Sequence, residues 1–450
     1  MYLSIQRIFR STIALNGFTA ALVALGCVLL FTGCQEECPM ETAGTTFSRT
    51  FGGSDFDVAN SIQQTSDGGY IITGRSNSSD GDVRQNNGKA DFWIVKLDRQ
   101  GTLEWEQAYG GPGDDEAKSI QQTFDGGYIV AGYTNGDVTD TDKEIDANAW
   151  VLKLDAQGTL VWEQTYGGPG YDEANSIQQT PDGGYIVAGA SEASGEEKEQ
   201  NKRGQNIWIL KLDDLGSLQW KKSYGGPGND RAHSIQLTFD GGYIVAGVGG
   251  ASGADIEQNK GESDFLIVKL DDQGTLEWEQ SYGGSGQDAA FSIQPTLDGG
   301  YIVAGHALSS DGDIGENKGQ SDFWVLKLAA SGTLEWEQSY GGSTWDGAHS
   351  IQQTYDGNYV VAGYTVSSDG DVSKIKGGSD LWILKLNGNG TLKSEQTYGG
   401  SIDDQAHSFQ LTSDGGYILA GYSLSSDGDV MENKGNQDLW VMKLDDPENL

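Results

Sequence analysis

The feature that most constrains this chain is a repeat of about 58 residues that occurs seven times. The copy from Tyr109 reads YGGPGDDEAKSIQQTFDGGYIVAGYT, then a variable stretch, then NAWVLKLDAQGTLVWEQ. Such regular spacing indicates an array of one supersecondary unit rather than a set of unrelated domains. The copies open at Phe51, Tyr109, Tyr166, Tyr224, Tyr282, Tyr340 and Tyr398.

Each copy contains four short strand patterns separated by turn signals. In the first copy these are NSIQQT, YIITGR, DFWIVKL and TLEWEQAYG. Runs rich in β-branched and aromatic residues are typical of strands, and Gly101 stands where a hairpin turn needs a left-handed residue. No segment shows a sustained helical period, and the chain has 67 glycines. We therefore expect an all-β fold.

Repeats of four strands suit the blades of a β-propeller, in which each twisted sheet packs against its neighbours around an axis. The seventh copy stops after its third strand pattern, whereas TTFSRTFGG precedes the first copy and aligns with TLEWEQAYGG. This alignment puts Phe47 in the place of Trp105. We predict that the N-terminal strand completes the last blade and closes a seven-bladed ring without open sheet edges. The propeller should span residues 45–446, followed by a tail of 447–450.

Tryptophan recurs at two positions of the repeat. We assign both sets to the core between blades, because recurrence in nearly every copy is what inter-sheet packing requires. Trp345 stands outside both sets, in a loop, where it could contact another molecule. The third-strand set is Trp93, Trp150, Trp208, Trp324, Trp382 and Trp440, and the fourth-strand set is Trp105, Trp162, Trp220, Trp278 and Trp336.

Aspartate fills the sixth position after every opening aromatic residue. A reaction centre seldom needs seven equivalents, so we interpret these carboxylates as structural groups that accept backbone N–H bonds in the link between blades. A ring of carboxylates around the channel is the alternative. The seven residues are Asp57, Asp115, Asp172, Asp230, Asp288, Asp346 and Asp404.

These patterns resemble the seven-bladed β-propeller repeat of secreted proteins and lipoproteins of the Bacteroidetes group. The matching segments are YGG, the Asp that follows it, SIQQT, DGGYIVAG, DFWIVKL and GTLEW. The resemblance runs from Thr45 to about Asp446. It implies the propeller fold and no family-wide catalytic motif.

The first 33 residues differ from the repeats and are expected to be a lipoprotein signal peptide. Two arginines precede an apolar run from Ile13 to Phe31, which has about signal-peptide length. The run ends in Phe-Thr-Gly-Cys, which predicts cleavage before Cys34 and lipidation of its thiol. Residues 34–44 would then form a flexible tether. A single transmembrane anchor is the alternative.

The chain is strongly acidic, with 66 acidic and 28 basic residues and a formal net charge of −38. We expect no nucleic-acid partner, because phosphate recognition needs clustered Lys and Arg, and membrane contact only through the lipid. The acidic run after Cys34 resembles the signal for outer-surface display in Bacteroidetes lipoproteins. We therefore expect the protein to be anchored in the bacterial outer membrane, and the acidic run adds the expectation that it faces the outside. We also expect a monomer.

The long loops between second and third strands share Asp-Gly-Asp and a further Asp in blades one, five, six and seven. Calcium takes several carboxylate and carbonyl oxygens on flexible loops, so these are candidate calcium sites. Solvated turns in which Asp caps its own backbone are the alternative. The loops of blades three and four lack the pattern and could form a separate binding patch. The candidate ligand sets are Asp80, Asp82 and Asp91; Asp311, Asp313 and Asp322; Asp369, Asp371 and Asp380; and Asp427, Asp429 and Asp438.

Three histidines share one repeat position, which other blades fill with Asn, Lys or Phe. To hold zinc they would have to meet across the channel, and the short zinc–ligand distances make this the weaker interpretation. The motifs of serine hydrolases, zinc proteases and nucleotide-binding loops do not occur in the sequence. The three are His233, His349 and His407; His306 has no partner visible in the sequence.

No motif specifies a reaction, so residues that differ between blades are where recognition is expected. We interpret the chain as an envelope or cell-surface lipoprotein that acts as a binding scaffold for a protein or glycan. No catalytic residue and no cofactor other than candidate calcium is assigned. One alternative is a glycan hydrolase or lyase that uses carboxylates on the loop-rich face, and another is a purely structural envelope protein. An enzyme would need one blade-specific acid, base and stabiliser in a pocket.

Overall fold

The computed structural model describes residues 45–136, 147–192, 204–226, 228–250 and 259–445. They belong to the compact unit Thr42–Leu450, which is distinct from the unit Met1–Glu41. The predicted signal peptide, Cys34, the tether and the tail lie outside the described residues. So do residues 193–203 and 251–258, which hold most of the two divergent loops of blades three and four. The described part of the chain contains no helix long and apolar enough to cross a membrane.

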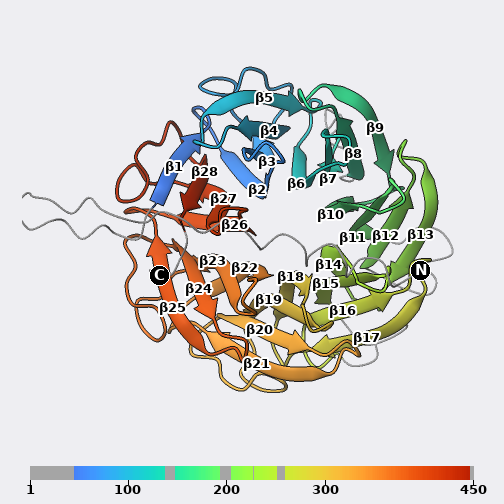
Figure 1. The fold of residues 1–450 in the computed structure, drawn as a ribbon, viewed down its shortest axis with the longest axis vertical. Helices are drawn as coiled ribbons and strands as arrows, with labels where there is room; N and C mark the ends of the chain where they lie inside the picture. The colour runs from blue at the N-terminus through green and yellow to red at the C-terminus, as the bar shows by residue number, and fades with distance from the viewer. Residues whose placement is uncertain (1–44, 137–146, 193–203, 227, 251–258, 446–450) are drawn as a thin grey trace, which may run out of the picture. The chain divides into compact units, whose positions relative to one another are not determined.

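The strands form seven antiparallel sheets of four, set around one axis as the blades of a β-propeller (Figure 1). In each of the first six blades the chain runs from a first strand beside the axis to a fourth strand at the rim (Figure 1). The second and third strands are buried on both faces, which explains why they read as nearly continuous apolar runs. The predicted all-β fold of seven four-stranded blades is confirmed.

The first strands are β2 (Asp57–Gln64), β6 (Asp115–Gln122), β10 (Asp172–Gln179), β14 (Arg231–Leu237), β18 (Asp288–Pro295), β22 (Asp346–Gln353) and β26 (Asp404–Leu411). The second strands are β3 (Tyr70–Ser76), β7 (Tyr128–Thr134), β11 (Tyr185–Glu192), β15 (Tyr243–Gly249), β19 (Tyr301–Ala307), β23 (Tyr359–Thr365) and β27 (Tyr417–Ser423). The third strands are β4 (Asp91–Leu97), β8 (Asn148–Leu154), β12 (Gln205–Leu212), β16 (Asp264–Leu270), β20 (Asp322–Leu328), β24 (Asp380–Leu386) and β28 (Asp438–Leu444). The fourth strands are β5 (Leu103–Tyr109), β9 (Leu160–Tyr166), β13 (Leu218–Tyr224), β17 (Leu276–Tyr282), β21 (Leu334–Tyr340), β25 (Leu392–Tyr398) and β1 (Thr45–Phe51).

The strand before the first repeat completes the last blade, as predicted. β1 pairs antiparallel with β28 at the outside of the sheet β1-β28-β27-β26 (Figure 1). Phe47 takes the role that Trp105 has one blade later. The ring centroid of Phe47 lies 5.9 Å from that of Tyr70, and Trp105 lies 5.9 Å from Tyr128. The ring is therefore closed by non-covalent contacts.

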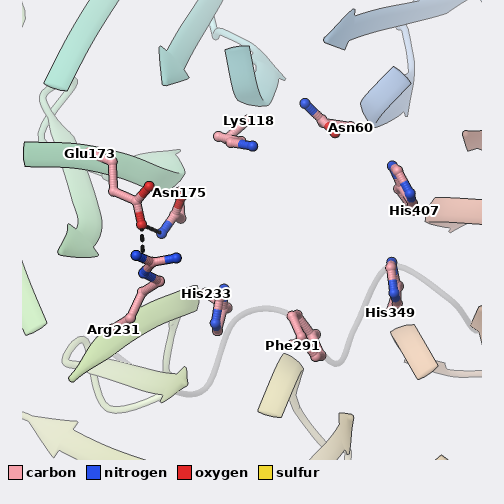
Figure 2. A pocket seen from close by; sticks show the side chains of 9 residues that line it. All are labelled: Asn60, Lys118, Glu173, Asn175, Arg231, His233, Phe291, His349 and His407. Atoms are coloured by element: carbon pink, nitrogen blue, oxygen red, sulfur yellow. Dashed lines mark hydrogen bonds and ion pairs between the residues drawn. The ribbon is translucent and has the colours of Figure 1, made fainter. Parts of the chain in front are cut away.

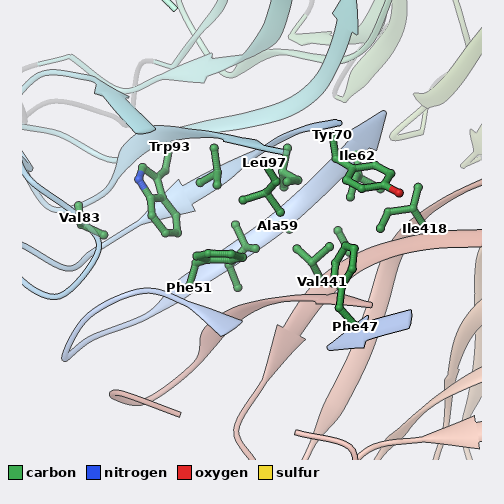
Figure 3. Close-up of a cluster of buried hydrophobic side chains, with 14 residues drawn as sticks. Phe47, Phe51, Ala59, Ile62, Tyr70, Val83, Trp93, Leu97, Ile418 and Val441 are labelled. Atoms are coloured by element: carbon green, nitrogen blue, oxygen red, sulfur yellow. The ribbon is translucent and has the colours of Figure 1, made fainter. Parts of the chain in front are cut away.

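A cluster of buried apolar side chains spans this closing junction (Figure 3). Phe47 and Phe51 from β1 and Ile418 from β27 belong to one cluster with Ile62 and Trp93 of the first blade. Similar clusters join the other neighbouring blades. Because burial of one large apolar side chain stabilises a protein by about 1.5–3 kcal/mol, these contacts can hold the closing junction as firmly as the covalently linked ones.

Polar side chains of the first strands also join neighbouring blades. Ser61 Oγ and Gln63 Oε1 accept hydrogen bonds from the backbone N–H groups of Ile120 and Gln122 in the next blade, at 3.3 and 2.6 Å. Ser408 repeats this contact across the closing junction, at 3.2 Å. Two backbone N–H groups at the inner edge of each of these two blades thus find acceptors in the neighbouring blade.

The two tryptophan sets differ in burial. All six third-strand tryptophans are buried, as expected. The five fourth-strand tryptophans pack against the clusters between blades, as predicted, but they are half-buried because the fourth strand is the outermost of its blade. Each covers a tyrosine of the next blade, as Trp162 does with Tyr185 at 5.9 Å. The turn glycines allow this approach, since a Cβ on Gly216, which has a φ of +80°, would lie 2.8 Å from the Trp162 ring.

Candidate functional site

Residues that differ between blades gather near one end of the central channel. One residue from each blade stands three positions after the repeated aspartate, on the first strand. Two further residues, Glu173 and Arg231, stand two positions nearer the strand start. Because the first strands begin where the chain arrives from the preceding blade, this is the loop-rich end of the channel. The side chains border a cavity of about 330 Å³ (Figure 2). Its lining residues are Asn60, Lys118, Glu173, Asn175, Arg231, His233, Phe291, His349 and His407.

One wall of the cavity is an arc of four rings. The ring centroids of His407 and His349 lie 5.2 Å apart, and those of His349 and Phe291 lie 5.3 Å apart. His233 follows at 4.7 Å from Phe291. Because neighbouring rings face one another along the arc, their edges meet the cavity (Figure 2). His306 lies 5.2 Å from Phe291, so all 4 histidines of the chain belong to this cluster.

The remaining wall carries paired charges. Lys118 Nζ lies 2.7 Å from Glu116 Oε1, and the side chains are 28% and 12% exposed. Arg231 Nε lies 2.8 Å from Glu173 Oε1, and the side chains are 39% and 4% exposed. In both pairs the cation is the more exposed member.

Two asparagines complete this wall, and their amide nitrogens are bonded to the protein. Asn60 Nδ2 donates to Ala117 O at 2.8 Å and to Glu116 Oε1 at 2.9 Å. Asn175 Nδ2 donates to Ala232 O at 3.0 Å and to Glu173 Oε1 at 2.9 Å. Each bond to a carbonyl reaches the next blade, so these residues also join blades around the channel.

Burial sets the charge state of the two walls. It lowers the pKa of His233 to about 3 and that of His407 to about 4, and it holds the pKa of His349 well below its ordinary value. Burial raises the pKa of Glu116, but the charge and hydrogen bond of Lys118, together with Arg75 and Asn60, lower it by more, so that it falls to about 2. At neutral pH the cavity thus presents neutral imidazoles, each with one N–H donor and one acceptor nitrogen, beside fixed charges.

The histidines do not form the zinc site considered from the sequence. Phe291 stands between His233 and His349 in the arc (Figure 2). His407 Nδ1 lies 3.0 Å from Ala59 O and is engaged there. Within the described ranges, no group of three or more His, Cys, Asp or Glu side chains could hold a metal ion.

The seven repeated aspartates lie at or immediately before the start of the first strands, where the link from the preceding blade ends. Asp57 Oδ2 accepts the N–H of Gly53 and the hydroxyl of Ser78, both at 2.8 Å, and the backbone N–H of Asp57 donates to Gln437 O at 2.7 Å. The other six accept the equivalent glycine N–H bond. All seven are at most 1% exposed. They therefore do not line the channel as a carboxylate ring.

At five junctions a second buried aspartate, from the third strand of the preceding blade, approaches the repeated one. A Cβ on Gly341 would lie 2.4 Å from Asp322 Oδ1 and 2.7 Å from Asp346 Oδ2. Burial raises the pKa of Asp322 to about 6, and the charge of Asp346 adds to the rise. The pairs are Asp438 with Asp57, Asp91 with Asp115, Asp264 with Asp288, Asp322 with Asp346, and Asp380 with Asp404; Asn148 and Asn206 replace the first member at the other two junctions.

The acidic loops do not assemble the predicted calcium ligand sets. Asp80 Oδ1 accepts the Ser54 N–H at 2.7 Å, and Asp82 Oδ2 lies 2.5 Å from Lys434 Nζ of the neighbouring blade. Lysines therefore neutralise carboxylates that calcium would need. Asp311, Asp369 and Asp427 repeat the contact of Asp80; Asp313, Asp371 and Asp429 pair with Lys260, Lys318 and Lys376; and Asp91, Asp322, Asp380 and Asp438 belong to the buried pairs.

The sequence pointed to part of this site and missed part of it. The histidine position was recognised, but Glu173 and Arg231, two residues before Asn175 and His233, were not. Residues two apart on a strand share a face, and this spacing was the available signal. Trp345 is 42% exposed, as expected for a loop residue, and does not line the cavity.

Together these features define a seven-bladed β-propeller protein with a blade-specific cavity in its channel. No family model matches the sequence. Similar solved structures include the WD40 domain of Pan2 from Neurospora crassa, with 12% identity, a TM-score of 0.47 and coverage of 85% of this chain and 88% of that chain. BamB from Moraxella catarrhalis has 14% identity, a TM-score of 0.39 and coverage of 88% and 85%. A protein of unknown function from Dyadobacter fermentans has 13% identity, a TM-score of 0.48 and coverage of 90% and 100%. With TM-scores under 0.5, these likenesses carry no argument about function.

One curated relative aligns with most of the chain. The regulatory protein FlaEY of Caulobacter vibrioides is 22% identical over 422 residues, which cover 89% of this chain and 40% of that protein. The chain thus spans about two fifths of the length of this relative. At this identity and coverage the relative does not show a family for this chain, and the propeller fold rests on the seven sheets described above.

Proposed function

We propose that this chain is a lipid-anchored protein of the bacterial outer membrane that acts as a binding scaffold for a protein or glycan. One observation carries the binding role. Polar groups common to the blades are used to hold the ring together, as Asp57 and Ser61 are, whereas blade-specific aromatic and charged side chains gather around one cavity. A cavity of a few hundred cubic ångströms with a few convergent polar groups is the ordinary form of a ligand site.

The sequence supports the proposed location. An apolar run ends in Phe-Thr-Gly-Cys, so Cys34 would carry the lipid. A bacterial lipoprotein cysteine bears several acyl chains, and more than one chain is needed for stable anchoring. Glu36 and Glu37 form the acidic run that resembles a surface-display signal.

Substitution of Cys34 tests the anchor. Cys34→Ala should remove the lipid and either block processing or release the protein from the membrane fraction, as seen by mass spectrometry and fractionation. A double change of Glu36 and Glu37 to Ala should keep the lipid and reduce protease accessibility on intact cells. Unchanged mass and membrane association of Cys34→Ala would refute the lipoprotein assignment.

A glycan array and a panel of envelope proteins, probed with the purified full chain, test the binding role. Saturable binding to one class is the expected result. Absence of saturable binding to either panel would favour the alternative of a purely structural envelope protein.

The glycan hydrolase alternative draws no support from the described residues. Glycosidases use two accessible carboxyl groups on either side of the bond. The close carboxylate pairs here, such as Asp322 with Asp346, are fully buried. At the cavity, Glu173 is ion-paired with Arg231, and Glu116, which does not line it, is ion-paired with Lys118. We therefore assign binding rather than hydrolysis to this site.

A further inference from the structure

The chain is strongly acidic, but the accessible charged groups at the cavity are basic. A lysine recurs in the third strand of every blade and serves the architecture, as Lys96 does with Asp67 at 3.0 Å. Lys118 and Arg231 have no such repeat role. They are the accessible members of their ion pairs, and both line the cavity. A ligand that enters the cavity therefore meets cations first.

These cations keep hydrogen-bond donors for a ligand. Of the five N–H donors of a guanidinium, Arg231 uses Nε toward Glu173 and Nη2 toward Gln205 Oε1 at 2.7 Å. An ammonium has three donors, and Lys118 directs one to Glu116. Across the cavity, the ring nitrogens of His233 and His349 have no hydrogen-bond partner in the described part of the chain. Each neutral imidazole can add one N–H donor.

We infer that this cavity binds a small organic anion, with its carboxylate held by Lys118 and Arg231 and its body against the arc from His233 to His407. This inference rests on the proposed binding function and names its ligand class. Charge-assisted hydrogen bonds to carboxylates are the strong ones, and Arg presents several of them in a fixed fork. A volume of about 330 Å³ suits a molecule about the size of a sugar acid.

The net charge of the chain does not argue against an anion. The charge of −38 repels anions at long range, but salt screens such fields over about 8 Å at physiological ionic strength. Glu173 also lines the cavity, but its side chain is 4% exposed against 39% for Arg231, and Glu116 is less exposed than Lys118, so the accessible charge at this wall is mainly cationic. Local charges therefore decide which ligand is held.

The histidines offer a direct test without any substitution, because all 4 lie in this cluster. We would label the full chain at the histidine rings and follow their NMR signals during titration with D-glucuronate. D-glucose is the matched control, since it differs only in having a hydroxymethyl group where glucuronate has the carboxylate, and sodium chloride keeps the ionic strength constant. An oligosaccharide that ends in glucuronate forms a third arm, which separates a free acid from the end of an acidic glycan.

We expect saturable shifts of the histidine signals with glucuronate, or with the oligosaccharide, and none with glucose. Equal shifts with glucose would overturn the inference in favour of a neutral polyol site. No shift with any probe would overturn it as well. Saturable binding on the glycan or protein panels without a histidine response would leave the scaffold function standing and remove only the anion site.

Substitutions of Arg231 and Lys118 then test which cation binds the carboxylate of the ligand. Arg231→Gln should weaken glucuronate binding by about tenfold or more, as expected for loss of a charge-assisted hydrogen bond. Arg84→Gln is the matched control, because Arg84 is 78% exposed, pairs with Glu106 and does not line the cavity. Lys118→Gln provides a second variant if Arg231→Gln fails to fold. Wild-type affinity in the folded cavity variants would refute the assignment.

Discussion

Replacing Asp322 by asparagine should stabilise the protein at neutral pH. Asp322 is fully buried, its Oδ2 accepts the Lys318 N–H at 2.7 Å, and its Oδ1 has no hydrogen-bond partner among the described residues. The carboxylate of Asp346 lies on the other side of the adjoining glycine. Asn148 and Asn206 occupy the same place at two other junctions. The fold therefore accepts an amide at this position.

The pKa of Asp322 sets the magnitude. Burial, and then the charge of Asp346, raise it from 3.8 to about 6. Because the folded protein binds this proton more tightly than the unfolded chain, the stabilisation is full below about pH 4 and is lost as the pH rises through about 6. A pKa difference of about 2 corresponds to about 3 kcal/mol. Asparagine carries no charge at any of these pH values and avoids this loss.

Urea unfolding at about pH 7.5 and about pH 4.5 measures the effect. Asp322→Asn should raise the free energy of unfolding by about 1–3 kcal/mol at the higher pH, and most of the gain should vanish at the lower pH. Asp346→Asn is the control at the same junction. Asp346 Oδ2 accepts the Gly342 N–H and the Ser367 hydroxyl, both at 2.8 Å, and Oδ1 accepts the Thr365 hydroxyl. Loss of an acceptor oxygen should destabilise that variant at both pH values. Equal stability of Asp322→Asn and wild type at about pH 7.5 would refute the buried ionised pair.

Three other perturbations test the ring and its loops. A chain that begins at Ser54 lacks β1 and should melt at a clearly lower temperature in circular dichroism, because β28 then has a free edge; an unchanged cooperative melt would contradict ring closure. Lys318→Met should lower the free energy of unfolding by roughly 0.5–1 kcal/mol, and high salt should shrink the difference, because the pair with Asp371 is partly exposed; no difference at low salt would count against a contribution from this pair. Chelator-treated protein should give no saturable heat with calcium, since Lys434 already pairs with Asp82. A calcium-dependent rise in melting temperature would restore the calcium interpretation.

The period of the repeat made the architecture predictable. Every copy must bury the same faces against the same kind of neighbour, so one strand pattern determined all the blades. The match of TTFSRTFGG to a fourth strand then predicted ring closure through Phe47. Exposure was harder to predict, because a pattern such as the fourth-strand tryptophans shows that a residue packs but not how much of it the next blade covers.

The contacts of the acidic loops and the cavity depend on distances that a linear pattern does not contain. Asp82 and Lys434 are 352 residues apart in the chain and meet only because the ring closes. A loop rich in carboxylates predicts a calcium site from sequence, whereas the structure shows that a lysine of the neighbouring blade pairs with one of the carboxylates. Arg231 likewise could not be recognised as a cavity residue from the sequence, because its neighbours in the cavity come from the first strands of other blades.

The pairing of the first strand with the last makes completion of the fold depend on completion of the chain. Thr46 Oγ1 donates to Asp445 Oδ1 at 2.5 Å, across 399 residues. Closing so long a loop costs about 5 kcal/mol of chain entropy, so the contact must be supported by the apolar cluster that forms with it. β1 is synthesised first and has no partner until β28 exists. A chain that ends before β28 therefore leaves β1 without its partner and the last blade without its third strand, whereas pairing of β1 with β28 removes both open edges.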